Sequence, residues 1–144
     1  MLKGVNHIAV MTADLDRFIE FYTQVFDMEM VFSEDTPTFR HAILRAGPDS
    51  WVHPIALTEP TDDGEASPST FHRGHLDHFA LTASSPEEFD EARSRLSARD
   101  ACGPGVDCLG PFRSVWFTDP DGMRGELVLI TDASLQGIHE PRPE

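Results

Sequence analysis

The sequence predicts an α+β protein built from two tandem modules, each with the element order β-α-β-β-β. Three observations predict it: a strand-like segment that occurs twice, an amphipathic helix pattern after each copy, and three extended segments after each helix. A repeat of this kind dictates architecture, because each copy forms one structural unit. The 144 residues suffice for one structural domain made of two such halves.

The repeated segment opens each module. Residues 5–10 read VNHIAV, and residues 76–81, at an offset of 71 positions, read LDHFAL. Both segments alternate in the manner of a half-buried strand. His7 and His78 occupy the same position in the two copies, and each is followed two residues later by an alanine that leaves room around the imidazole.

An amphipathic helix is expected after each repeated strand. Asp14 can cap the first helix, and Ser85 with Pro86 and Glu88 forms a capping box for the second. Apolar residues then recur at helical spacing. The expected buried stripes are Leu15, Phe18, Ile19, Tyr22 and Phe26 in the first helix, and Phe89, Ala92 and Leu96 in the second.

Short extended segments complete each module. They are expected at about residues 29–33, 38–46 and 51–58 in the first module, and at 106–109, 113–118 and 123–131 in the second. The turn-forming sequence at 119–122, DPDG, separates the last two strands. These limits divide the chain into a first module (1–58), a linker rich in Asp, Pro, Ser and Thr (59–74), a second module (75–131) and an irregular tail (132–144).

The net charge and the cysteine content limit the classes of function that are expected. A formal net charge of −14 opposes binding to nucleic acid or to an anionic membrane surface. No apolar run approaches the roughly 18 residues that a membrane helix needs, and no targeting segment stands out. With only Cys102 and Cys108 present, free thiols in a reducing cytoplasm are expected.

An acidic residue in the last strand is the strongest chemical signal. Glu126 lies in the otherwise apolar run GELVLI, directly after the DPDG turn. Burying a carboxylate there is costly unless it is paired or binds a cation. Glu126 on a solvent-facing edge is the alternative. Two histidines in repeat-equivalent positions and one strand glutamate suggest a metal site.

These motifs together resemble the vicinal oxygen chelate superfamily, which includes glyoxalase I, extradiol dioxygenases, fosfomycin-inactivating enzymes, methylmalonyl-CoA epimerase and bleomycin-resistance proteins. The resemblance rests on residues 6–10, the Phe21-Tyr22 pair, residues 77–81, and DPDG followed by Glu126, and it covers residues 3–130. It implies two βαβββ modules whose mixed sheet curls around a metal-binding cup.

The resemblance implies that His7, His78 and Glu126 bind one divalent metal ion. His72 and His75 are alternatives, but only His78 preserves the repeat offset. A possible fourth family position is expected at Ile55 or Ala56, neither of which can bind metal. Two histidines and one carboxylate leave coordination positions open, which suits Fe²⁺ while also accepting Mn²⁺, Ni²⁺, Co²⁺ or Zn²⁺.

Other residues are candidates for acid–base chemistry and substrate binding. His53 resembles the second-sphere catalytic histidine of the extradiol dioxygenases, provided that its strand turns it toward the metal. Trp116 stands where those enzymes have a tyrosine, and it could stack on a substrate. Arg113 or Arg124 could bind an anionic group, while Glu59 is a weaker candidate at the site.

The predicted function is a metal-dependent enzyme acting on a small substrate that chelates the metal through neighbouring oxygens. Dioxygenase-type chemistry is slightly preferred. The alternatives are an isomerase, epimerase or lyase that works through an enolate, and a metal-free binding protein of the bleomycin-resistance kind. The resemblance also implies a homodimer, in which the metal site lies within one chain or is shared between two.

Overall fold

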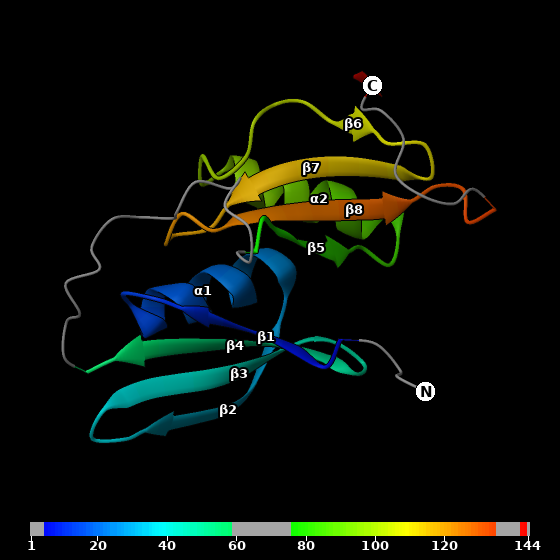
Figure 1. Cartoon of the computed structure of the whole chain (residues 1–144). Coiled ribbons are helices and arrows are strands. Elements are labelled where there is room, and N and C mark those ends of the chain that lie inside the picture. Colours follow the sequence, from blue (N-terminus) through cyan, green and yellow to red (C-terminus); the bar gives the residue numbers. More distant parts are fainter. Residues whose placement is uncertain (1–4, 59–75, 135–141, 144) are drawn as a thin grey trace. The chain divides into compact units, whose positions relative to one another are not determined.

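The structure, a computed structural model, describes residues 5–58, 76–134 and 142–143. The chain divides into two compact units, residues 1–66 and 67–144, and the boundary falls within the predicted linker, which lies outside the described residues. Each unit repeats the predicted order of one strand, one helix and further strands (Figure 1). The α+β class with tandem βαβββ modules is therefore confirmed.

The first unit is a four-stranded sheet with one helix. Its strands take the order β1-β4-β3-β2, in which β1 and β4 are parallel and the other pairs are antiparallel. The elements are β1 (His7–Met11), α1 (Leu15–Phe26), β2 (Glu29–Asp35), β3 (Phe39–Gly47) and β4 (Ser50–Leu57).

Helix α1 covers one face of this sheet. Asp14 caps it as predicted, since its carboxylate accepts the Arg17 backbone N–H. Of the predicted stripe, Leu15, Phe18 and Tyr22 are buried, and they are joined by Phe21 and Val25. The sheet side of the core consists of Ala42, Leu44, Val52, Pro54 and Ala56. The alternate residues of β4 therefore lie on the other face of the sheet.

The second unit repeats the plan with a five-stranded sheet. The order is β5-β8-β7-β6-β9, again with its first pair parallel and the rest antiparallel. The elements are β5 (Phe79–Thr82), α2 (Pro86–Ser97), β6 (Asp107–Cys108), β7 (Phe112–Thr118), β8 (Arg124–Ile130) and β9 (Arg142–Pro143).

The predicted helix cap, buried helix stripe and turn of the second unit all form. Ser85 caps α2, and the predicted stripe Phe89, Ala92 and Leu96 is buried. In the DPDG turn, Asp119 accepts the backbone N–H groups of Asp121 and Met123. The prediction of a wholly irregular tail is wrong at residues 142–143, because β9 pairs with β6.

Among the described residues, no helix has the length and apolar character needed to cross a membrane.

Gly125 creates a close approach between β7 and β8. It pairs with Phe117, and a Cβ added to it would lie 2.1 Å from Cζ of that buried ring. Gly125→Ala is therefore expected to lower the free energy of unfolding by about 1–3 kcal/mol through overpacking. Urea denaturation measures the loss. Gly105→Ala is the control, since its added Cβ would meet nothing within 4 Å; an equal effect of the two changes would contradict this account.

Candidate metal centre

The second unit brings two of the predicted ligands together. Ala80 on β5 pairs with Glu126 on β8, and His78 lies two residues before Ala80. His78 Nε2 is 3.4 Å from Glu126 Oε2. The parallel pairing of β5 and β8 thus places an imidazole and a carboxylate side by side.

Glu126 is a buried carboxylate with a fixed orientation. Its residue is only 4% exposed, although every other side chain from Gly125 to Leu129 is apolar or absent. Ser114, on the neighbouring strand β7, is fully buried and donates its hydroxyl to Glu126 Oε1. The serine satisfies one oxygen of the carboxylate and leaves Oε2 facing His78.

Asp77 determines which nitrogen of His78 carries hydrogen. Asp77 Oδ1 lies 2.6 Å from His78 Nδ1, and a carboxylate oxygen only accepts. Nδ1 must therefore donate, so the neutral imidazole presents its Nε2 lone pair to Glu126 Oε2. Two acceptors face each other, and this contact is favourable only with a proton or a cation between them. The donor chemistry of the pair therefore fits a divalent metal, with Asp77 in the outer role common at metal-binding histidines.

The first unit repeats this arrangement around His7. Asn6 Oδ1 lies 2.9 Å from His7 Nδ1, so the amide oxygen accepts from Nδ1–H. The exposed His7 ring then presents Nε2 as its acceptor nitrogen. In both units the residue immediately before the histidine fixes the tautomer that metal binding through Nε2 requires.

The strand pairing identifies His53 as the first-unit counterpart of Glu126. Ala9 pairs with His53 on β4, just as Ala80 pairs with Glu126 on β8. The placement of the fourth position at Ile55 or Ala56 is therefore wrong. The constant offset of 71 residues does not extend to the last strand of the module, because the equivalent residues there, His53 and Glu126, are 126 − 53 = 73 positions apart.

His53 lies on the same face of the sheet as His7. Their ring centroids are 6.0 Å apart, and α1 covers the opposite face, where Ala56 is buried with Leu15. Burial lowers the pKa of His53, and the nearby His41 and His7 rings lower it further. On this face the first unit thus presents the exposed imidazole of His7 and the partly buried imidazole of His53, with the His41 ring next to His53.

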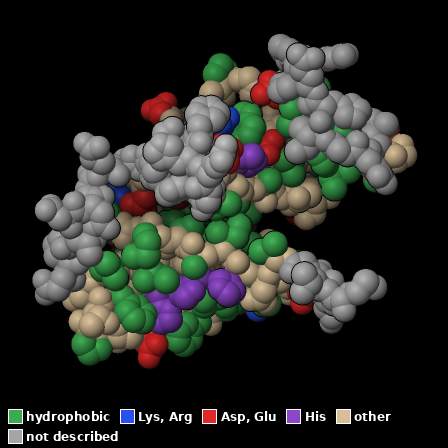
Figure 2. All heavy atoms as spheres, viewed as in Figure 1, with side chains coloured by type: hydrophobic (Ala, Val, Ile, Leu, Met, Phe, Trp, Pro, Cys, Tyr) green, Lys and Arg blue, Asp and Glu red, His purple; other side chains and the backbone are tan. Residues whose placement is uncertain are grey.

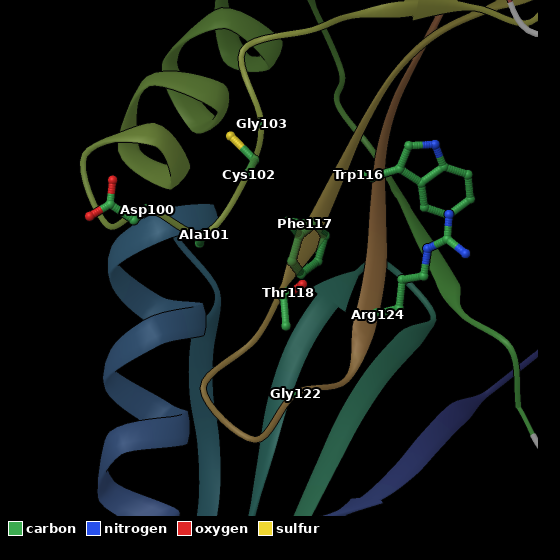
Figure 3. A pocket seen from close by; sticks show the side chains of 9 residues that line it. All are labelled: Asp100, Ala101, Cys102, Gly103, Trp116, Phe117, Thr118, Gly122 and Arg124. Carbon is green, nitrogen blue, oxygen red and sulfur yellow. The ribbon is translucent and has the colours of Figure 1, made fainter. Parts of the chain in front are cut away.

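Trp116 lines the same sheet face as Glu126. It pairs with Glu126 across β7 and β8, and its ring contacts His78 edge-on at 4.8 Å between centroids. The Arg124 guanidinium stacks on its indole at 3.9 Å (Figure 3). Trp116 and Arg124 also line an open hollow of about 610 Å³, whose far side is the segment from Asp100 to Gly103.

Arg113 lies on the opposite face of this sheet. Alternation along β7 separates it from Ser114 and Trp116, and its guanidinium lies over the Phe89 ring of α2, at 5.1 Å from the centroid. This placement contradicts the expectation that Arg113 binds substrate beside Glu126. Of the two arginines considered, Arg124 is the one on the Glu126 face.

Within the described residues, no three His, Cys, Asp or Glu side chains converge on one point that could hold a metal ion. The first unit offers His7 and His53, and the second offers His78 and Glu126. His72, His75 and Glu59 lie outside the part of the chain that the structure describes.

Three supporting residues escaped the sequence prediction. Asn6 and Asp77 precede the two histidines, and a signal for them was present, because both copies of the repeat carry a side-chain acceptor at this position. Ser114 gave a weaker signal as a small polar residue in the apolar strand β7. Its contact with Glu126 depends on the register of β7 against β8, where Ser114 pairs with Val128.

The two-module fold and the metal-compatible pair define the class of protein. The model of the Glyoxalase/Bleomycin resistance protein/Dioxygenase superfamily matches residues 4–127. The chain belongs to this superfamily.

Two curated relatives are enzymes. The chain is 29% identical to lactoylglutathione lyase GLX1 of Arabidopsis thaliana over 125 residues, covering 85% of this chain and 42% of that protein. It is 28% identical to a 2-epi-5-epi-valiolone epimerase of Actinomyces sp over 152 residues, covering 87% of this chain and 78% of the epimerase. The chain therefore spans less than half the length of the plant lyase.

Solved structures share the fold. The glyoxylase/bleomycin resistance protein/dioxygenase domain from Frankia sp. EAN1pec has a TM-score of 0.78 at 22% identity, over 92% of this chain and 96% of that one. The fosfomycin resistance protein FosX from Listeria monocytogenes, complexed with Mn(II) and sulfate, has a TM-score of 0.63 at 23% identity, over 91% and 95% of the two chains.

Proposed function

We propose that this protein is a metal-dependent isomerase, epimerase or lyase that moves a proton next to a carbonyl group of a small, oxygen-rich substrate. The observation that carries the proposal is the buried Glu126 carboxylate facing the acceptor nitrogen of His78. His53, as the first-unit counterpart of Glu126, adds a proton-transfer group to the same set. The curated lyase and epimerase relatives support this chemistry over ring cleavage.

His7, His78 and Glu126 would hold the metal. Two imidazoles and one carboxylate accept Mn²⁺, Fe²⁺, Co²⁺, Ni²⁺ or Zn²⁺, and the FosX structure that contains Mn(II) supports a metal of this group. A bound divalent ion supplies Lewis-acid stabilisation of negative charge that develops on a substrate oxygen. This chemistry needs no change in the oxidation state of the metal, so Fe²⁺ is no longer preferred.

Other residues of the chain would orient the ligands and the substrate. Ser114 and Asp77 hold Glu126 and His78 in place through single hydrogen bonds. His53 would take the proton from carbon and return it, as a partly buried imidazole can near neutral pH. Trp116 would provide a flat apolar wall, and Arg124 a positive charge for an anionic substrate group.

The test combines metal analysis with proton exchange. Protein purified without chelators is expected to contain one divalent ion per site. When it is incubated without oxygen in D₂O with an α-hydroxy ketone, S-lactoylglutathione or 2-epi-5-epi-valiolone, deuterium is expected to enter the carbon beside the carbonyl, as NMR would detect. Bound metal without exchange in any substrate of this panel would contradict the proton-transfer proposal.

A ring-cleaving dioxygenase is the second candidate, favoured by the two histidines and one carboxylate. Trp116 counts against it, because an indole cannot do the acid–base work of a phenol. Oxygen uptake with catechols by the Fe²⁺-loaded protein would favour this candidate. A metal-free binding protein would instead take up no metal and would keep its ligand affinity after His7→Ala.

Removing Asp77 should weaken metal binding without unfolding the protein. Asp77→Ala is expected to lower the affinity for Mn²⁺ or Zn²⁺ about 10–100-fold, as loss of an outer carboxylate partner does at other histidine sites. Isothermal titration measures the change. Asp90→Ala, which removes an exposed carboxylate from α2, is the control; equal affinities in the two variants would contradict the role of Asp77.

The proposed ligands come from both units, so the proposed site would form either within one chain or between two copies in a homodimer. Mixing His7→Ala with Glu126→Ala, each inactive alone, distinguishes these arrangements. Recovery of metal binding and exchange after joint refolding indicates a shared site, since one intact site forms per mixed dimer. No recovery indicates that each chain forms its own.

A further inference from the structure

A row of polar side chains crosses the first unit on the face away from α1. Glu34 on β2 is directly opposite His41 on β3, and His41 is diagonal to His53 on β4. His53 in turn is opposite Ala9, two residues from His7 on β1. Figure 2 shows histidine side chains lying next to one another on one face of this unit. Cross-strand and diagonal neighbours of this kind are within reach of each other.

The row is continuously bonded from Glu34 to His53. Glu34 Oε2 lies 3.1 Å from His41 Nε2, and His41 Nδ1 lies 2.8 Å from His53 Nε2. Both ring nitrogens of His41 are therefore engaged, one by a carboxylate and one by an imidazole. Because its two partners lie on opposite sides of the ring, the arrangement is a chain of hydrogen bonds and not a cluster around one ion.

Two phenylalanines hold the His41 ring in place. Phe32 and Phe39 contact it edge-on, at 5.5 Å and 5.1 Å between centroids. The His41 side chain is 15% exposed, whereas that of Glu34 is 56% exposed. The middle of the chain is thus packed and its outer end is open to solvent.

We propose that Glu34 and His41 are positioning residues that fix the ring orientation and the tautomer of His53. A carboxylate only accepts, so His41 donates from Nε2 and keeps a lone pair on Nδ1. His53 must then donate from Nε2 to that lone pair. The neutral His53 consequently keeps its own lone pair on Nδ1, which is the atom it offers to substrate. This assignment rests on the proposed role of His53 as the proton-transfer group.

NMR of the full-length, metal-free protein tests the hydrogen-bond chain without any activity. With ¹⁵N-labelled histidine, a scalar coupling is expected between His53 Nε2 and His41 Nδ1 across their hydrogen bond. The His53 Nδ1 shift is expected to be that of a wholly unprotonated nitrogen. In Glu34→Ala, the ring shifts of both histidines should move toward the average of two tautomers. Absence of the coupling, or unchanged shifts in Glu34→Ala, would overturn the proposal whatever the protein catalyses.

Kinetics then tests the positioning role. Glu34→Ala is expected to slow deuterium exchange roughly 10–100-fold, by analogy with the range found for outer partners of metal-binding histidines, with the metal content unchanged. Glu34 is exposed, so the variant should fold. Glu29→Gln, which alters another exposed carboxylate of β2, is the matched control and should keep the wild-type rate. A wild-type rate in Glu34→Ala would overturn the positioning role, whereas failure of the proposed function would appear as no exchange in the wild type itself.

Discussion

Glu126→Gln is expected to remove most of the metal-dependent stabilisation of the protein while leaving its fold intact. The amide keeps an oxygen that can accept the Ser114 hydroxyl, but it loses the negative charge that faces His78 Nε2. Loss of a charged ligand should weaken divalent metal binding by roughly 100-fold or more, beyond the 10–100-fold cost of losing an outer partner.

Thermal or urea unfolding with added Zn²⁺ or Mn²⁺ measures this effect. At a metal concentration 100 times the wild-type Kd, binding stabilises the wild type by about 2.7 kcal/mol, and a variant with a 100-fold weaker Kd retains about 0.4 kcal/mol. Glu91→Gln, an exposed glutamate of α2, should behave as the wild type. Full metal stabilisation of Glu126→Gln would show that the carboxylate is not a ligand.

The sequence repeat predicted the fold well because it reports local physics. The caps at Asp14 and Ser85, the buried helix stripe headed by Phe89 and the DPDG turn each depend on neighbours within a few residues. The tail was predicted less well. Strand β9 forms only because β6, more than 30 residues earlier, offers a free edge, and no pattern within residues 132–144 reports that partner.

The sequence suggested the candidate ligands but not the residues that support them. His7, His78 and Glu126 are recognisable because histidine and glutamate are costly in strands that otherwise carry apolar residues. The error over Ile55 came from counting residues where the modules differ in length. The register of the paired strands shows that His53 is the residue equivalent to Glu126, since Ala9 pairs with His53 as Ala80 pairs with Glu126.

Side-chain direction explains the remaining differences. Arg113 and Ser114 are adjacent in sequence, yet one contacts Phe89 on the helix face and the other bonds Glu126 on the open face. A shift of one residue in a strand exchanges the two faces. The sequence alone does not determine which residues of β7 face the helix. It therefore could not distinguish an arginine that binds substrate from one that packs against α2.

His53→Ala is expected to slow proton exchange about 10²–10⁴-fold, the usual contribution of a positioned acid–base group, with the bound metal retained. His53 is partly buried beside His7 and bonds His41, so truncation leaves a space the size of an imidazole ring. Added imidazole should therefore restore part of the rate, which a merely structural role would not allow. The measurement is deuterium incorporation at fixed metal occupancy, with and without imidazole.

The metal content of the same variant separates two roles that the geometry of His53 permits. As the register counterpart of Glu126, His53 could instead complete the coordination of the ion. In that case His53→Ala would lose metal in parallel with activity, and imidazole would restore both together. Retained metal with lost exchange assigns proton transfer to His53, through the Nδ1 lone pair that remains when its Nε2 bonds His41.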